Sequence, residues 1–193
     1  MNKKLVLASS SPRRRTILEN LGLNFVIMKS GIEEKISEDQ LPQHIVMALA
    51  LEKALDISED LEDNTIVIAA DTIVYKDRVL GKPKSFEDAF STLYYLQGDV
   101  HYVYTGLAVI EKGTYKKIVT YDRTKVKIKE LSESKIKKYI DTGEVWDKAG
   151  SYAIQGFGST IVEWIQGDYF NVVGLPVAKL EDILFEHFRI EIL

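Results

Sequence analysis

The sequence contains no cysteine, which excludes disulfide bonds and thiolate chemistry. A chain without cysteine suits a reducing compartment, and we expect the protein to work in the cytoplasm. Long apolar runs are also missing. No stretch approaches the length of a membrane span, and the apolar residues after Lys4 are too few for the core of a signal peptide. We therefore expect neither a membrane anchor nor a disulfide framework.

Several common catalytic signatures are absent as well. The sequence has no GxGxxG motif, no GxSxG motif and no glycine-rich run before a Lys-Ser/Thr pair, so it has no Walker loop. The three histidines are His44, His101 and His187, and no two of them have a metal-ligand spacing such as HExxH. His101 could be structural or line a pocket, and we favour the structural role.

The sequence has no excess of positive charge, because 29 acidic residues outnumber 25 basic ones. The 193 residues carry a net charge of −4, which argues against a surface that coats nucleic acid. Any phosphate site must then be a local basic pocket. Hydrophobic residues make up 46% of the chain and charged residues 28%, a balance typical of a globular protein. Because no repeat or low-complexity segment divides the chain, we expect a single domain over residues 1–193.

Hydrophobic periodicity predicts strands that alternate with helices, followed by hairpins. We expect strands over residues 3–8, 23–28, 65–75, 98–110, 115–129 and 159–165, and helices over residues 12–21, 42–57, 85–96, 132–142 and 175–188. A turn at residues 76–78 should form a hairpin. This order favours a mixed sheet in an α/β or α+β fold over a regular doubly wound one.

The turn between the first strand and the first helix organises the chain. Three serines, residues 9–11, lead into Pro12, which suits the first helical position, and Ser11 is a suitable N-cap residue. The start of a helix attracts anions, and Arg13 and Arg14 add forked donors that match phosphate oxygens. The pattern predicts a phosphate site, although cap serines and arginines on a solvated face would give the same residues.

Asp71 is the most informative single residue. It lies in the most apolar stretch of the chain, where a carboxylate is costly unless it is paired, bound to a metal or functional. A buried aspartate satisfied by backbone donors is the alternative, and we favour a functional role. Lys53 and Lys82 are candidate cations, and Glu33 is a candidate metal ligand. Taken alone, the lysines are typical of surface residues and Glu33 of a solvated acidic loop.

The segment over residues 148–158 contains three glycines, which allow a ligand to approach the backbone closely. Within it, Gln155 can offer a donor and an acceptor to the edge of a nucleobase. A tight loop with a structural amide is an equally good interpretation of these residues.

Taken together, these segments resemble the Maf family of nucleoside triphosphate pyrophosphatases from one end of the chain to the other. The resemblance is carried by Leu7-Ala8-Ser9-Ser10-Ser11-Pro12-Arg13-Arg14, Lys53, Ala70-Asp71-Thr72, Gly81-Lys82-Pro83, His101, Thr105-Gly106, Asp147-Lys148-Ala149-Gly150, Ile154-Gln155-Gly156 and residues 169–176. It implies the fold of the inosine triphosphate pyrophosphatases, with a mixed, mostly antiparallel long sheet flanked by helices and two lobes around a cleft.

The resemblance also implies an activity, the hydrolysis of a nucleoside triphosphate to its monophosphate and pyrophosphate. Asp71 matches the family's general base, and Arg13, Thr72 and Gln155 match its specificity positions. Thr72 and Gln155 point to the branch that prefers dTTP and UTP, with CTP or modified pyrimidine nucleotides as further candidates. Such an enzyme would clear unwanted nucleotides from the cellular pool.

The remaining expectations concern the substrate, the metal and partners. The triphosphate would be held by Ser9, Ser11, Arg13, Arg14, Lys53 and Lys82. A divalent cation, Mg²⁺ or Mn²⁺, would be held by Glu33 or Asp71 together with phosphate oxygens. We expect no nucleic-acid or membrane partner, and leave a homodimer open. Two other functions compete: a phosphatase that removes only the terminal phosphate, and a non-catalytic nucleotide-binding regulator of cell division and septum formation.

Overall fold

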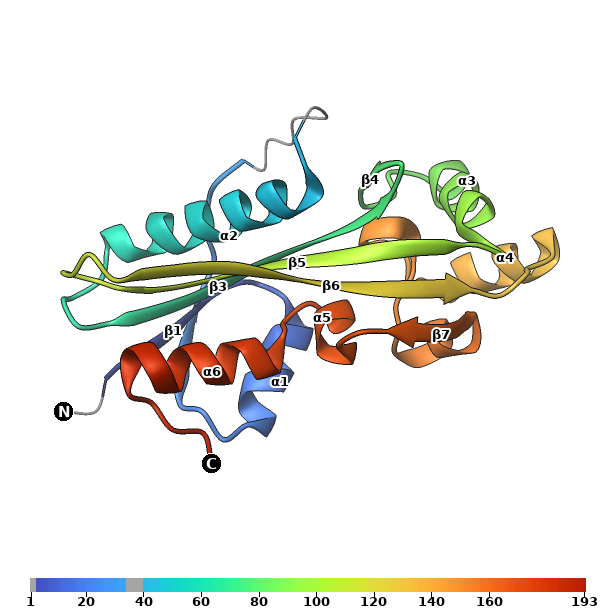
Figure 1. Ribbon diagram of the computed structural model, residues 1–193. Helices are drawn as coiled ribbons and strands as arrows, with labels where there is room; N and C mark the ends of the chain where they lie inside the picture. Colours follow the sequence, from blue (N-terminus) through green and yellow to red (C-terminus); the bar gives the residue numbers. More distant parts are fainter. Residues whose placement is uncertain (1–2, 34–39) are drawn as a thin grey trace. The chain divides into compact units, whose positions relative to one another are not determined.

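The computed structural model describes residues 3–33 and 40–193 (Figure 1). Its elements are β1 (Leu5–Ala8), α1 (Pro12–Asn20), β2 (Phe25–Met28), α2 (Pro42–Glu59), β3 (Ile66–Lys76), β4 (Arg78–Leu80), α3 (Phe86–Leu96), β5 (Val100–Glu111), β6 (Lys117–Ile128), α4 (Glu133–Ile140), η1 (Ala149–Ser151), η2 (Gly156–Thr160), β7 (Val162–Gln166), α5 (Tyr169–Val173) and α6 (Val177–Phe188). Among these described residues, no helix has both the length and the apolar character needed to cross a membrane.

The strands form one seven-stranded sheet in the order β2-β1-β3-β5-β6-β7, with β4 paired to β3. The pairs β1–β2 and β1–β3 are parallel, whereas β3–β4 and β6–β7 are antiparallel. Lys112, which follows β5, donates its backbone N–H to the carbonyl of Thr65, which precedes β3, so these two long strands run in opposite directions. A short turn joins β5 to β6, where the N–H of Glu111 bonds the carbonyl of Lys116. The predicted mixed, mostly antiparallel sheet is confirmed.

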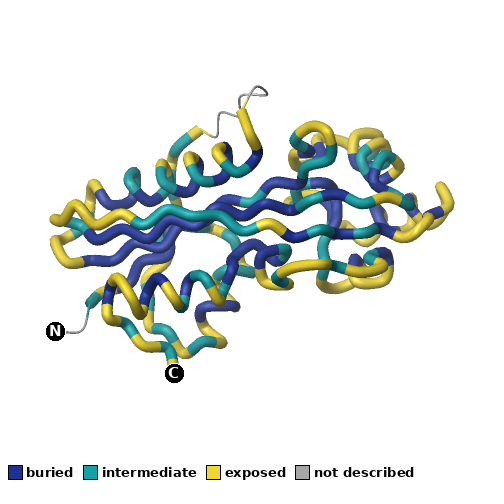
Figure 2. The backbone as a smooth tube through the Cα atoms, in the orientation of Figure 1, coloured by how far each residue is buried: buried dark blue, intermediate teal, exposed yellow. Residues whose placement is uncertain are grey.

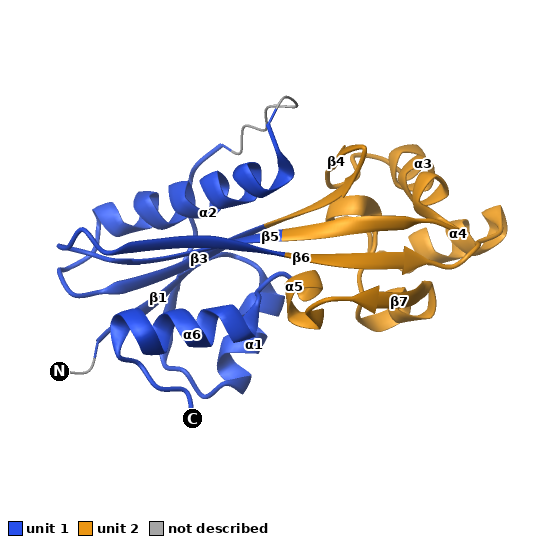
Figure 3. Ribbon diagram, in the orientation of Figure 1, with its two compact units in different colours: residues 1–71, 105–122, 174–193 blue, residues 72–104, 123–173 orange. Residues whose placement is uncertain are grey.

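The chain forms two compact units, coloured separately in Figure 3. Unit 1 contains residues 1–71, 105–122 and 174–193, and unit 2 contains residues 72–104 and 123–173. The boundaries fall inside β3, β5 and β6, so each unit is assembled from segments that are far apart in the sequence. No single cut in the chain would separate them.

In unit 1, α2 packs on the strands through small residues. Ala50 and Ala54 of α2 share a buried cluster with Val6 of β1 and Ala69 of β3. The closest contact is at Gly106 of β5, where a Cβ atom would lie 2.0 Å from the carbonyl oxygen of Val46 in α2. The backbone of the helix therefore lies directly on the backbone of the strand. Figure 2 shows these strand segments as buried and α2 as a mixture of buried, intermediate and exposed residues.

In unit 2, the core forms between α3, α4 and one face of the strands. Leu93 and Leu96 of α3, Ile136 of α4, and Val126 and Ile128 of β6 are fully buried in one cluster. Both helices begin at a serine whose hydroxyl accepts the N–H three residues later. The helices predicted over residues 85–96 and 132–142 begin at these same serines, which are typical N-cap residues.

The sequence Ser85-Phe86-Glu87-Asp88 resembles a capping box with Asp in place of Glu or Gln, and the structure departs from this pattern in one bond. The hydroxyl of Ser85 accepts the N–H of Asp88 at 3.2 Å, as expected. In a capping box, the Asp88 carboxylate would accept the backbone N–H of Ser85. Here it accepts the N–H of Lys84 at 2.9 Å instead.

The strand expected over residues 159–165 begins later than predicted. Residues 156–160 form the 3-10 helix η2 instead, and β7 starts at Val162. The hydroxyls of Ser159 and Thr160 bond back to the carbonyls of Gly156 and Phe157, at 2.7 and 2.8 Å. Such local bonds compete with strand pairing, which explains the error.

The short helix α5 was not predicted. Its sequence is rich in aromatic and β-branched residues, which have modest helix propensity. The Asp168 carboxylate accepts the N–H of Phe170 at 2.8 Å and helps to start this turn.

Candidate functional site

The turn between β1 and α1 belongs to unit 1 and is held by side-chain hydrogen bonds. The Ser9 hydroxyl accepts the backbone N–H of Ser11 at 3.2 Å and Nη1 of Arg14 at 3.2 Å. Arg14 Nε also donates to the carbonyl of Gly174 at 2.7 Å. Arg14 therefore ties the turn to the segment that leads into α6.

Ser11 occupies the predicted N-cap position of α1, with φ −69° and ψ 117°, but its hydroxyl makes no capping hydrogen bond. The expected side-chain cap is therefore wrong in detail, since the hydroxyl that bonds the backbone of this turn comes from Ser9. Arg13 is half-buried in the first helical turn. Arg15 is exposed and pairs with Glu19 at 2.6 Å, as expected for a surface residue.

Asp71 lies in β3 as the last residue of unit 1, and only 6% of it is exposed. Its Oδ1 accepts Nζ of Lys53, from α2, at 2.5 Å. The two side chains are 9% and 13% exposed. A carboxylate at this depth requires a partner, and the ammonium of Lys53 supplies the compensating charge.

The serine–arginine turn follows the end of β1, and Asp71 lies a short way further along the parallel strand β3. β1 and β3 are parallel, with Leu7 opposite Ile68. Ala8, the last residue of β1, comes one residue after Leu7, and Asp71 comes three residues after Ile68. Unit 1 therefore brings together a turn with two arginines and a buried, charge-paired carboxylate.

Glu33 is exposed and is the last residue described before residue 40. Among residues 3–33 and 40–193, no three His, Asp or Glu side chains are grouped so as to hold a metal ion. Of the two candidate metal ligands, Asp71 is therefore the one with a defined, buried environment.

Three of the expected site residues lie in unit 2. Thr72 is half-buried in β3, and Lys82 and Gln155 are exposed. The loop that carries Lys82 is joined to the glycine-rich segment, because Gly150 donates its N–H to the carbonyl of Gly81 at 3.0 Å. Unit 2 therefore places the Lys82 loop directly beside η1.

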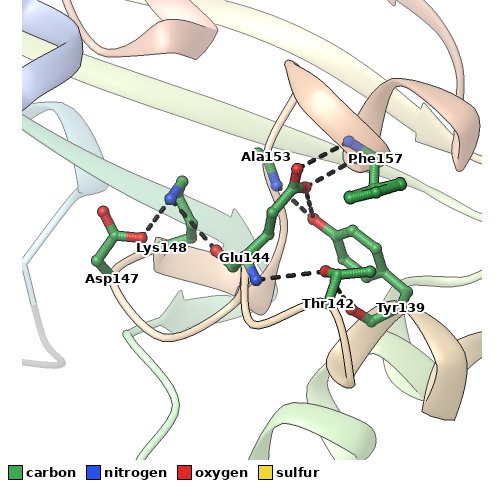
Figure 4. A network of polar contacts seen from close by, with 8 residues as sticks. Tyr139, Thr142, Glu144, Asp147, Lys148, Ala153 and Phe157 are labelled. Carbon is green, nitrogen blue, oxygen red and sulfur yellow. Dashed lines mark hydrogen bonds and ion pairs between the residues drawn. The ribbon is translucent and has the colours of Figure 1, made fainter.

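The loop around Gln155 is held by Glu144, which sequence analysis did not single out. Figure 4 shows the Glu144 carboxylate turned toward this loop. Oε1 accepts the N–H of Phe157 at 2.8 Å, and Oε2 accepts the N–H of Gly158 at 3.0 Å. Gln155 is the N-cap residue of η2 and makes no side-chain capping bond. The carboxylate of Glu144 thus caps η2 in place of Gln155, the residue at the N-cap of this helix.

Tyr139 completes this network from the end of α4 (Figure 4). Its hydroxyl donates to Oε2 of Glu144 at 3.2 Å and accepts the N–H of Ala153 at 3.0 Å. Burial raises the pKa of the Tyr139 phenol, and the nearby Glu144 carboxylate raises it further. The phenol therefore stays protonated and can donate to the carboxylate.

His101 has the structural environment that we favoured. It is fully buried in β5, and its Nε2 forms a 2.6 Å hydrogen bond with the hydroxyl of Tyr152. Burial lowers the pKa of His101 from 6.5 to about 4, and the Lys76 ammonium acts in the same direction. The imidazole is therefore neutral near pH 7.

The chain is similar in sequence to known proteins over nearly its whole length. A family model described as "Maf-like protein" matches residues 4–187. A dTTP/UTP pyrophosphatase of Caldanaerobacter subterraneus subsp. tengcongensis is 57% identical over 189 residues, covering 97% of this chain and 91% of that protein. A protein of the same name from Alkaliphilus oremlandii is 49% identical over 191 residues, covering 99% of this chain and 100% of its own. The solved Staphylococcus aureus Ham1 protein is 15% identical, with a TM-score of 0.45 over 81% of this chain and 78% of that chain.

Proposed function

Since this chain belongs to the family of Maf-like proteins, we propose that it hydrolyses dTTP and UTP to the nucleoside monophosphates and pyrophosphate. Relatives with the name dTTP/UTP pyrophosphatase align with nearly the whole chain at 49–57% identity. The structural observation that best supports the proposal is the buried Asp71 carboxylate, which is paired with Lys53 and lies on the strand parallel to the one that leads into the serine–arginine turn.

In this proposal the triphosphate binds through cations and hydroxyls. Ser9, Ser11 and Arg13 lie on the β1–α1 turn, where the positive end of α1 adds to the attraction for phosphate. Arg14 contributes charge and also maintains the shape of the turn through its bonds to Ser9 and Gly174. Lys82, which is exposed in unit 2, is the further candidate cation.

The proposed reaction is attack of a water oxygen on the α-phosphorus. A new bond forms between this oxygen and the phosphorus, and the bond from the phosphorus to the oxygen shared with the β-phosphate breaks. Pyrophosphate leaves with that oxygen, and the proton of the attacking water passes to the Asp71 carboxylate. Lys53 fixes the orientation of this carboxylate through their 2.5 Å contact. The catalytic effect would come from positioning and charge stabilisation.

A divalent cation fits this arrangement if it arrives with the substrate. Mg²⁺ is commonly held by one or two carboxylates together with phosphate oxygens and water, so a three-residue protein cage is not required. Asp71, and Glu33 as the second candidate, would be the protein ligands. When bound, the cation would neutralise negative charge on the leaving pyrophosphate.

Base selection is assigned to Gln155 and Thr72. The Gln155 amide has one carbonyl acceptor and an NH₂ donor, which complement the adjacent acceptor and donor of a 2,4-dioxopyrimidine. Thymine and uracil share this edge. Gln155 is exposed, so a ligand can reach it.

We also propose that the enzyme acts in the cytoplasm, where the absence of cysteine is no disadvantage. A homodimer stays a prediction, and analytical ultracentrifugation would test it.

A turnover screen tests the proposed function. The purified chain is incubated with each common nucleoside triphosphate in Mg²⁺ or Mn²⁺, and pyrophosphate and orthophosphate are measured separately. We expect dTTP and UTP to turn over fastest, with one pyrophosphate released per monophosphate. Faster turnover of ATP or GTP would contradict the base assignment. Release of orthophosphate as the first product would instead identify a terminal phosphatase.

A further inference from the structure

We propose that Glu144 is a positioning residue for base recognition and that it acts through the loop that carries Gln155. This inference rests on the proposed function, in which Gln155 selects the pyrimidine. All the residues involved lie within unit 2.

The first observation is that Glu144 and Tyr139 hold the loop on both sides of Gln155. Before Gln155, the N–H of Ala153 bonds the hydroxyl of Tyr139. After it, the N–H groups of Phe157 and Gly158 bond the two oxygens of Glu144. Because Tyr139 also bonds Glu144, the three backbone anchors share one network (Figure 4). The backbone at Gln155 is therefore fixed from two directions.

The second observation concerns the Gln155 amide. The first N–H groups of a helix need acceptors, and the residue at the N-cap commonly provides one. Gln155 occupies that position in η2 and does not provide it, because the Glu144 carboxylate does so instead. Glu144 thus frees the Gln155 amide from capping its own helix, and the amide can bind a base.

The third observation is the close fit between the carboxylate and the loop. Gly156 has φ +59°, and a Cβ atom there would lie 2.1 Å from Oε1 of Glu144. A side chain at position 156 would therefore displace the carboxylate from the two N–H groups that it accepts. Gly156, directly after Gln155, leaves the space that the Glu144 carboxylate occupies.

The backbone that carries Tyr139 and Glu144 is also held by hydrogen bonds. The hydroxyl of Thr142 donates to the carbonyl of Tyr139 at 2.7 Å and accepts the N–H of Glu144 at 3.3 Å. Lys148 Nζ donates to the carbonyl of Glu144 at 3.2 Å. The Glu144 side chain therefore extends from a turn that is itself held by hydrogen bonds. Such support suits a residue that must keep Gln155 in position.

The test is the variant Glu144→Gln, which keeps the size of the side chain but replaces one acceptor oxygen by a donor. We expect KM for dTTP to rise about tenfold and kcat to change by less than about threefold, the scale of one lost charge-assisted hydrogen bond. The preference for dTTP over GTP, taken as the ratio of the kcat/KM values, should fall by a similar factor. A merely structural role would lower thermal stability and leave this ratio unchanged, which would overturn the proposal.

Glu133→Gln is the matched control. Glu133 lies in the first turn of α4, is 65% exposed and pairs with Lys137. The same substitution there should leave both KM and the preference for dTTP unchanged. Tyr139→Phe is the second variant, in case Glu144→Gln does not fold. It removes one hydroxyl and should shift the preference in the same direction, and an unshifted preference in this folded variant would contradict the proposal.

A double-mutant cycle tests whether Glu144 acts through Gln155. In a Gln155→Ala background, Glu144→Gln should cause no further loss of the preference for dTTP. Additive losses would overturn the proposed route. If the wild-type chain shows no preference for dTTP, the proposed function itself fails. If Gln155→Ala abolishes the preference and Glu144→Gln retains it, only the present inference fails.

Discussion

The ammonium of Lys53 and the carboxylate of Asp71 form a 2.5 Å ion pair between α2 and β3, with both side chains almost fully buried. This pair explains how an apolar strand accommodates a carboxylate. It also gives the carboxylate a fixed direction, because Lys53 approaches Oδ1. An oriented carboxylate is what a general base for water attack requires.

The first prediction concerns the charge of Asp71. Asp71→Asn keeps the shape of the side chain and an acceptor for Lys53 but removes the proposed base. We expect kcat to fall by at least about two orders of magnitude, the usual scale for loss of a positioned base. Nucleotide binding should persist, because the serine–arginine turn is unchanged. Single-turnover hydrolysis and calorimetric binding measure the two effects. A folded variant that hydrolyses dTTP at nearly the wild-type rate would exclude Asp71 as the base and favour Glu33.

The second prediction concerns the stability of unit 1. Lys53→Met leaves the Asp71 carboxylate buried without this cation, and we expect the free energy of unfolding to fall by about 3 kcal/mol. Lys4→Met is the matched control, because Lys4 pairs with Glu62 at 2.6 Å while the two side chains are 73% and 80% exposed. The control should have no measurable effect in urea denaturation. If both variants lost the same free energy of unfolding, burial of the ion pair would not determine the effect of removing its lysine.

The third prediction separates neighbouring arginines of α1. Arg13→Ala should lower kcat/KM for dTTP by about tenfold or more, because the proposed site loses a cation assigned to phosphate binding. Arg15→Ala should leave kcat/KM unchanged, since Arg15 is exposed and pairs with Glu19. Circular dichroism confirms that both variants fold. An unaltered kcat/KM in Arg13→Ala would identify this residue as part of a solvated face.

The fourth prediction concerns the dependence of stability on pH. Burial lowers the pKa of His101 from 6.5 to about 4; the Lys76 ammonium also lowers it, and the Asp99 carboxylate opposes the shift. Between these two pH values the unfolded chain binds a proton that the folded chain does not. The stability contributed by His101 is therefore lost as the pH falls from 6.5 towards 4 and changes no further below that.

Urea denaturation of the wild-type chain and of His101→Gln measures this contribution. Between pH 6.5 and pH 4.5, the wild type should lose about 2 kcal/mol more of its unfolding free energy than the variant loses. If both proteins show the same pH dependence, His101 is not protonated on unfolding in this range.

Much of the fold follows from local sequence patterns. The first strand, the serine turn and the helix that begins at Pro12 were predictable, because N-cap residues and a proline at the first helical position act on adjacent backbone. Asp71 was also identifiable, since a carboxylate within an apolar run is conspicuous in any fold. The helix α2 and the two long strands β5 and β6 were predicted to within about two residues at each end.

The contacts that define the site could not be predicted in the same way. Lys53 and Asp71 are 18 residues apart, and their pairing depends on how α2 lies on β3. Glu144 bonds the backbone 13 and 14 residues later, and no sequence pattern signals a carboxylate that caps a distant 3-10 helix. The only hint in the sequence was the glycine at position 156, because a glycine permits a close approach such as that of the Glu144 carboxylate. These are tertiary relationships, which periodicity and capping rules do not describe.

The position of water attack tests the central claim most directly. The purified chain hydrolyses dTTP in H₂¹⁸O, and mass spectrometry locates the label in the products after a single turnover. Attack on the α-phosphorus predicts one ¹⁸O atom in dTMP and none in pyrophosphate. Label in pyrophosphate, or release of labelled orthophosphate with dTDP, would contradict the proposed reaction.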